Sequence, residues 1–133
     1  MKYILIIITT LLFLSGINEI NAQQRIDNLI DKMSTTSDMK LTSTITREPK
    51  TRKIKMVLKK LEMSYSFSYG NIFKQAFKDE TNNASYSKVI ADDKENSIYK
   101  QTLIFKKKEY SSIYELDYSS GGSMTVTIVH KYN

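Results

Sequence analysis

The chain has 133 residues, contains no cysteine and carries a formal net charge of +6 at pH 7, with 20 Lys and Arg against 14 Asp and Glu. The missing cysteine excludes disulfides, thiol nucleophiles, cysteine-based zinc sites and a lipoprotein anchor. A basic chain favours acidic partners, here an anionic polymer or an envelope protein, although small periplasmic proteins are often basic without any such partner.

The first 22 residues have the pattern of a secretory signal peptide. Lys2 precedes an apolar run over residues 3–14, which is shorter than the roughly 20 residues of a membrane-spanning helix. We expect cleavage after Ala22, export to the periplasm or beyond, and a single mature domain over residues 23–133 without a membrane span. The alternative is an uncleaved N-terminal membrane anchor.

The mature chain opens with a predicted amphipathic helix over Gln23–Thr35. Its apolar residues recur at the spacing of one helix face, which predicts that this face packs on the core. These residues are Ile26, Leu29, Ile30 and Met33.

A β-hairpin is predicted next, because two runs rich in Thr, Ile and Val flank Pro49, the only proline. Proline suits a turn, and side chains alternate between the two faces of a strand. The alternation puts Leu41, Ser43 and Ile45 on one face of the first strand. In the second strand it puts Ile54, Met56 and Leu58 on one face and Lys53, Lys55 and Lys59 on the other.

The lysine stripe of this hairpin has two interpretations. It can follow an anionic polymer, with release of counterions, or it can protect an edge strand against pairing with another chain. We favour edge protection. The aromatic alternation over Ser64–Tyr69 reads as a strand or an extended loop whose rings form either a stacking platform or, more commonly, part of the core. The candidate binding residues are therefore Arg52, Lys53, Lys55, Lys59, Tyr65 and Tyr69.

A second helix is predicted from an N-cap at Asn71 to about Glu80, and four strands follow it, over residues 85–91, 97–106, 109–118 and 123–132. Tyr99, Leu103 and Phe105 share one face, and Met124, Val126 and Ile128 point inward. Short connections favour antiparallel neighbours. The expected fold is α+β, a two-layer sandwich with two helices on one face of an antiparallel sheet of about five or six strands, in the order αββαββββ.

Few residues suggest chemistry. Glu115 and Asp117 alternate on one strand face, a spacing that suits either glycan hydrolysis or pairing with lysines across the sheet. His130 is the only histidine and has no partner readable from the sequence. The polar turn at 92–96 lacks the glycine and the spacing of an EF-hand loop. We expect neither a metal site nor a cofactor.

Several of these segments together resemble a known family. They are the signal ending Asn21-Ala22-Gln23, the helix over residues 25–32, the turn over residues 47–53 and the stretch Phe73–Phe77. The chain is similar to a family of small exported proteins of Bacteroides-type bacteria, catalogued as a domain of unknown function. The resemblance implies envelope export and a small α+β domain and carries no catalytic residues. We expect a non-enzymatic binding or interaction domain; the alternative is a small glycan hydrolase that uses Glu115 and Asp117.

Overall fold

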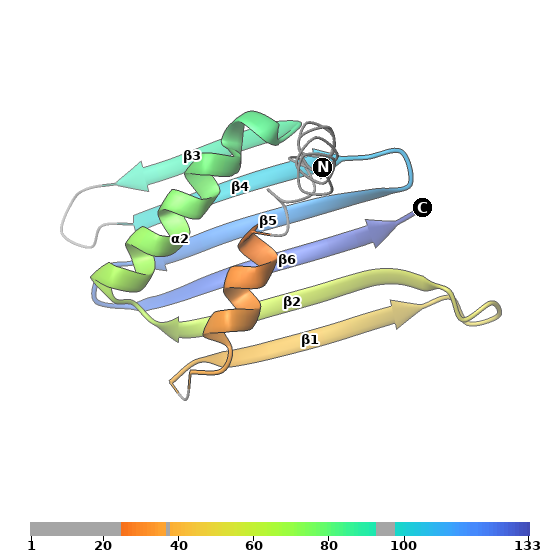
Figure 1. Ribbon diagram of the computed structural model, residues 1–133, viewed down its shortest axis with the longest axis horizontal. Helices are drawn as coiled ribbons and strands as arrows, with labels where there is room; N and C mark the ends of the chain where they lie inside the picture. Colours follow the sequence, from red (N-terminus) through yellow and green to blue (C-terminus); the bar gives the residue numbers. More distant parts are fainter. Residues whose placement is uncertain (1–24, 37, 93–97) are drawn as a thin grey trace, which may run out of the picture.

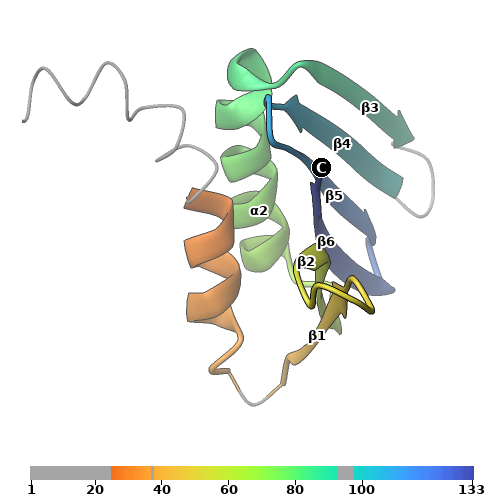
Figure 2. The ribbon, with the colours of Figure 1, turned by 90° about the vertical axis from the view of Figure 1, so that its right-hand side faces the viewer.

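The computed structural model describes residues 25–36, 38–92 and 98–133, and the expected signal peptide and most of the turn at 92–96 lie outside these residues. Six antiparallel strands form one open sheet in the order β1-β2-β6-β5-β4-β3. Both described helices cover the same face of this sheet (Figures 1 and 2). The α+β prediction and the element order are confirmed.

The strands of the sheet agree closely with the sequence-based boundaries, and the last four begin and end within one residue of them. The first helix occupies residues 25–33 of the described chain, and α2 covers Phe67–Glu80, followed by a short 3₁₀ turn at Thr81–Asn83. The strands are β1 Lys40–Arg47, β2 Ile54–Ser64, β3 Tyr86–Asp92, β4 Ile98–Lys106, β5 Tyr110–Ser119 and β6 Ser123–Tyr132.

The hydrophobic core lies between the helices and the sheet. Ile26 and Ile30 of the first helix and Phe73 and Phe77 of α2 are fully buried, and each such side chain contributes about 1.5–3 kcal/mol through burial. The predicted inward faces of β4 and β6 are confirmed. The strand residues of this core include Leu61, Leu103, Phe105, Tyr114, Leu116, Met124, Val126 and Ile128.

Helix α2 begins earlier than predicted. Ser66 is its N-cap, with extended backbone (φ −133°, ψ 150°), and its hydroxyl accepts a hydrogen bond from the backbone N–H of Tyr69 at 3.1 Å. The prediction of Asn71 as the cap is wrong, because the serine satisfies the open N–H groups one turn sooner. The neighbouring aromatics consequently do not form one platform: Tyr65 stacks on Tyr118, whereas Phe67 is 75% exposed.

In β2, the residues that face the helices are the odd-numbered ones. Leu61 and Met63 are buried there, so Lys55 and Lys59 point to the helix side and Met56 and Leu58 point to the open face. Ile54 breaks this alternation, because a register shift between Thr46 and Arg47 pairs it with Arg47 on the helix side. The lysines are tolerated because the helices cover only the later part of β2, and Lys59 reaches Asp31 of the first helix at 3.6 Å. Since β2 is paired with both β1 and β6, it is not an edge strand, and the edge-protection interpretation fails.

Within the described parts of the chain, neither helix is long and apolar enough to cross a membrane.

Candidate binding site at the basic end of the sheet

Three segments that are distant in sequence meet at one end of the sheet, on the right in Figure 1. They are the β1–β2 turn, the β4–β5 turn and the end of β6. The backbone N–H of Asn133 donates to the carbonyl of Glu109 at 3.0 Å, and its side-chain amide donates to the carbonyl of Lys108 at 3.0 Å. A shallow pocket joins the segments, lined by Lys53, Ile54, Lys108, Glu109, Tyr132 and Asn133.

All of the excess positive charge of the chain belongs to this end, which we call the basic end. It holds nine of the 20 Lys and Arg residues and two of the 14 Asp and Glu residues, Glu48 and Glu109. The remaining 11 basic and 12 acidic residues nearly cancel, so the net charge of +6 arises here. The nine are Arg47, Lys50, Arg52, Lys53, Lys55, Lys106, Lys107, Lys108 and Lys131.

The β1–β2 turn holds its basic residues in a defined geometry. The N–H of Glu48 donates to the carbonyl of Lys53 at 2.7 Å, and the N–H of Arg52 donates to the carbonyl of Glu48 at 2.9 Å. Arg52 adopts a positive φ of 62°, which is uncommon for a residue with a side chain. The guanidinium of Arg47 donates to the Arg52 carbonyl at 3.1 Å, and Lys55 pairs with Glu48 at 2.9 Å. The turn is therefore a fixed scaffold for the charges it carries.

The candidate binding residues from the sequence separate into two groups. Arg52, Lys53 and Lys55 lie at the basic end. Tyr65 lies past the other end of β2, which is 11 residues long or roughly 35 Å at 3.3 Å per residue. Tyr65 and Tyr69 pack against the core, and Lys59 is held by Asp31. The structure thus does not bring the tyrosines and the lysines together.

Sequence reasoning did not assign binding to four residues of the basic end: Lys106, Lys107, Lys108 and Lys131. The lysine run was visible as a turn, but its position beside the hairpin depends on β6 lying between β2 and β5. The site also contains Tyr110 and Tyr132, whose ring centroids are 6.0 Å apart. Tyr132 is 44% exposed, so an aromatic surface borders the positive charges.

Glu115 and Asp117 lie on the open face of the sheet, away from both helices. Glu115 pairs with Lys100 at 3.5 Å, and it is in register with Thr102 and Thr127 on the neighbouring strands. A glycosidase needs its two carboxyl groups on either side of a bound sugar, in a site that shifts the pKa of one of them. Neither residue lines the pocket at the basic end or a second groove, which lies between the two helices.

His130 has partners that its sequence position did not reveal. Its Nδ1 is 2.6 Å from the Ser112 hydroxyl, and its Nε2 is 3.7 Å from the Asp27 carboxylate. Although a serine, a histidine and a carboxylate meet here, Ser112 is fully buried and cannot reach a substrate. Burial, together with the charge of Asp27, raises the pKa of Tyr114 well above its usual range. The group is best explained as a polar link between the first helix and the sheet.

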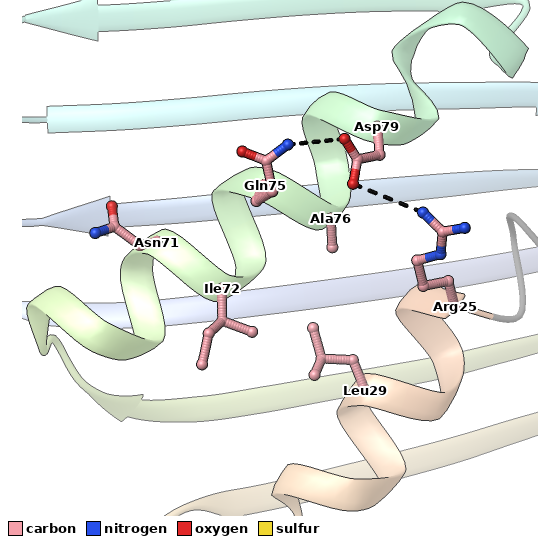
Figure 3. Close-up of a pocket in the computed structure, with 7 residues that line it drawn as sticks. All are labelled: Arg25, Leu29, Asn71, Ile72, Gln75, Ala76 and Asp79. Atoms are coloured by element: carbon pink, nitrogen blue, oxygen red, sulfur yellow. Dashed lines mark hydrogen bonds and ion pairs between the residues drawn. The ribbon is translucent and has the colours of Figure 1, made fainter.

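A second shallow groove runs between the two helices, where Leu29 and Ile72 point toward each other (Figure 3). Its carboxylate, Asp79, already pairs with Arg25 at 3.6 Å and accepts a hydrogen bond from Gln75 at 2.8 Å. The groove therefore offers an incoming ligand little beyond apolar contact. In the described part of the chain, no group of three or more His, Asp or Glu side chains is placed to hold a metal ion.

Comparison with known proteins identifies a family. A model of a domain of unknown function, DUF5024, matches residues 23–129, which is most of the chain. The chain belongs to this family. Searches of curated proteins and of solved structures gave no match.

Proposed function

We propose that this DUF5024 domain is a non-enzymatic binding domain of the cell envelope, and that its basic end holds a linear anionic polymer. The observation that supports this function is the segregation of charge. The three segments of the basic end contain nine basic residues and only two carboxylates, while the rest of the chain is nearly neutral. A polymer with regularly spaced anionic groups binds such a surface by releasing its counterions.

The shape of the site suits a polymer better than a small anion. The pocket that joins the three segments is shallow and open, and its lining includes the apolar side chain of Ile54 and the ring of Tyr132. Rings beside cationic side chains stack on sugars or bases while the cations meet the charged groups. Acidic glycans and single-stranded nucleic acids share this chemistry.

The envelope location in this proposal depends on the signal-peptide pattern at the N-terminus. It requires that the protein recovered from the envelope or the medium start near Gln23, which N-terminal sequencing determines. A protein that is recovered only from the cytoplasm with its first 22 residues intact contradicts it.

The test compares two triple variants that change the net charge equally. The basic-end variant carries Lys50→Gln, Lys53→Gln and Lys108→Gln. The control variant carries Lys32→Gln, Lys40→Gln and Lys78→Gln, all exposed positions outside the basic end. Affinity for heparin and for single-stranded DNA is measured by fluorescence anisotropy over a series of salt concentrations.

We expect the slope of log affinity against log salt for DNA to fall by roughly two to three in the basic-end variant, since three neutralised phosphates are lost. The control variant should keep the slope of the wild type. Preference for heparin over DNA would assign the natural ligand to the acidic glycans, and the reverse preference to nucleic acids. Equal slopes in the two variants would show that the basic end is not the site.

A further inference from the structure

The open face of the sheet carries a single row of apolar side chains that crosses five strands. Strand registers align Leu58 with Val129, Val129 with Ile113, Ile113 with Ile104, and Ile104 with Tyr86. All five are at least partly exposed, and Tyr86 is 50% exposed. Neighbouring strands lie about 4.8 Å apart, so this apolar row is about 19 Å long.

The rows on both sides of the apolar row are mainly polar. One contains Lys60, Thr127, Glu115, Thr102 and Lys88, and the other contains Met56, Lys131, Ser111 and Lys106. The outer face of an antiparallel sheet is ordinarily polar throughout. A contiguous exposed apolar patch with polar borders is typical of a protein–protein contact.

Both borders of the apolar row are positively charged. Lys88, Lys106 and Lys131 make no ion pair with any described residue, and Lys60 pairs with Glu62 at 3.0 Å. The one carboxylate in the two borders, Glu115, is already paired with Lys100. A complementary partner therefore presents an apolar stripe with carboxylates along both sides.

A second copy of the same face does not meet this requirement. If two copies met face to face with their apolar rows aligned, the lysine borders of one would lie over the lysine borders of the other. Like charges set against each other across an interface cost several kcal/mol. The shape of the row also suits another element: an α-helix rises 1.5 Å per residue, so about 13 residues cover 19 Å with one apolar stripe.

We propose that the open face of the sheet docks an amphipathic helix of a partner protein, with Leu, Ile or similar side chains along one stripe and Asp or Glu on both flanks. The five apolar residues contact the stripe, and the bordering lysines contact the flanks. This surface is separate from the pocket at the basic end, which neither Lys106 nor Lys131 lines, although both lysines are counted among the basic residues of that end.

The probe is a synthetic 16-residue amphipathic peptide with a leucine stripe and glutamate flanks, labelled for fluorescence anisotropy. A peptide with lysine flanks and a scrambled peptide of the same composition serve as controls. The protein variants are the full chain with Ile113→Thr and Val129→Thr, and a matched control with Leu41→Thr and Ile45→Thr. Threonine is β-branched and therefore suits a strand at all four positions. The control residues are exposed apolar residues of β1 on the helix-facing side.

We expect the row variant to lose at least tenfold in affinity for the acidic peptide, the control variant to bind like the wild type, and the lysine-flanked and scrambled peptides not to bind. Lys88→Glu, at an exposed position of the β3 edge, should also weaken binding of the acidic peptide at least threefold. This variant leaves the apolar row intact, so it tests the proposal even if the double variant fails to fold. The affinity of the row variant for heparin should be unchanged. Peptide binding therefore tests this proposal, and heparin binding tests the proposed function of the basic end independently.

Three results would overturn the proposal. The row variant and Lys88→Glu could bind the acidic peptide as tightly as the wild type. The wild type could form a concentration-dependent dimer in ultracentrifugation that the row variant abolishes, which would identify a second copy as the occupant. The wild type could sediment with vesicles of anionic phospholipid and fail to bind the acidic peptide. If the row variant no longer sediments with the vesicles, the occupant is a lipid surface instead.

Discussion

At the scale of single residues, Gly70 shows how packing reverses a local preference. A Cβ added at this position in α2 would lie 2.6 Å from Cε2 of Tyr65. The Tyr65 ring has little freedom to move, because it stacks on Tyr118 with centroids 4.8 Å apart, and Tyr118 stacks on Tyr99 at 5.3 Å. In an ordinary helix interior, alanine is more stable than glycine by about 1 kcal/mol.

We therefore predict that Gly70→Ala lowers the free energy of unfolding by about 1 kcal/mol, since overpacking costs more than the gain in helix propensity. In a Tyr65→Ala background, where the ring is absent, Gly70→Ala should raise the free energy of unfolding. Urea denaturation of the four proteins of this cycle measures both effects. A Gly70→Ala protein that is more stable than the wild type would show that the ring yields freely.

Glu80, at the end of α2, is a buried acidic residue with incomplete compensation. Burial raises its pKa above the ordinary value of 4.5, and the charge of Asp79 acts in the same direction. A hydrogen bond from Asn83 at 3.4 Å and the charge of Arg25 at 3.9 Å lower the pKa without cancelling the effect of burial. The folded protein therefore holds the Glu80 proton to higher pH than the unfolded chain does.

This difference makes stability depend on pH. In the interval from 4.5 up to the raised folded pKa of Glu80, the folded state binds more protons, so the free energy of unfolding decreases as pH rises. We predict that Glu80→Gln reduces this decrease. Urea denaturation between pH 4 and pH 8 checks it, with Glu62→Gln, a partly exposed carboxylate of β2, as the control. Identical pH profiles for Glu80→Gln and the wild type would contradict the assignment.

The start of α2 shows the limit of prediction from local sequence patterns. Serine and asparagine both favour N-caps, and the sequence presents several such residues, Ser64, Ser66, Ser68 and Asn71, within eight positions. The choice of Ser66 is fixed by packing, because it lets Tyr65 stack on Tyr118 and lets Phe73 and Phe77 reach the core. No local preference distinguishes these caps, so the helix start was predicted five residues late.

At the scale of elements, β1 is the strand most exposed to pairing with another chain. It lies at the edge of the sheet, and all eight of its residues are exposed. Its sequence is rich in threonine and contains Leu41 and Ile45, which are 37% and 51% exposed. Its only charged residues are Lys40 and Arg47, at its two ends, and a β-branched strand with an uncharged centre and no proline is a template for aggregation. The lysines that the sequence analysis interprets as edge protection lie one strand inward, on β2.

We predict that Ile45→Lys reduces aggregation on heating, because a charge on the edge disfavours pairing with a second chain. Its free energy of unfolding should change by less than about 0.5 kcal/mol, as is usual for exposed positions. Light scattering during thermal denaturation measures aggregation, and Lys40→Ile should have the opposite effect. An unchanged scattering midpoint in both variants would mean that β1 is not where association begins.

The elements differ in how well the sequence predicts them, because some of their features depend on local patterns and others on distant parts of the chain. The stripe of Ile26, Leu29, Ile30 and Met33 and the alternation of Met124, Val126 and Ile128 are local patterns, and the structure confirms both. The orientation of β2 is not local. Its first half extends beyond the helices, so Lys55 occupies the face that would be core if a helix covered it. Hydrophobic alternation alone therefore does not show which face of β2 the helices cover.

At the scale of the whole molecule, β6 joins the two parts of the chain. It pairs with β2, whose residues lie between 59 (Ser64 with Ser123) and 75 (Met56 with Lys131) positions earlier, and with its neighbour β5. This insertion brings the lysine run of the β4–β5 turn beside the β1–β2 turn and aligns the apolar row of the open face. The sequence predicted the number of strands and their antiparallel character, but neither surface was predictable, because both depend on which strand lies between which neighbours.

The sheet order also predicts how stability is distributed. Both edge strands, β1 and β3, consist entirely of exposed residues, whereas β5 and β6 have neighbours on both sides and supply fully buried side chains such as Leu116 and Val126. Amides in such central strands exchange only when the whole domain unfolds, and edges open locally.

We predict that the slowest amide hydrogen exchange falls in β5 and β6, at Leu116, Val126 and their neighbours, and that β1 and β3 exchange at least a hundredfold faster. Exchange followed by NMR resolves each strand. The acidic peptide, if it docks across the open face as proposed, should slow exchange in β3 more than in β1, because its contacts include Tyr86 of β3 but no apolar residue of β1. Protection of β1 equal to that of β6 in the protein alone would mean that its free edge is already paired with another chain.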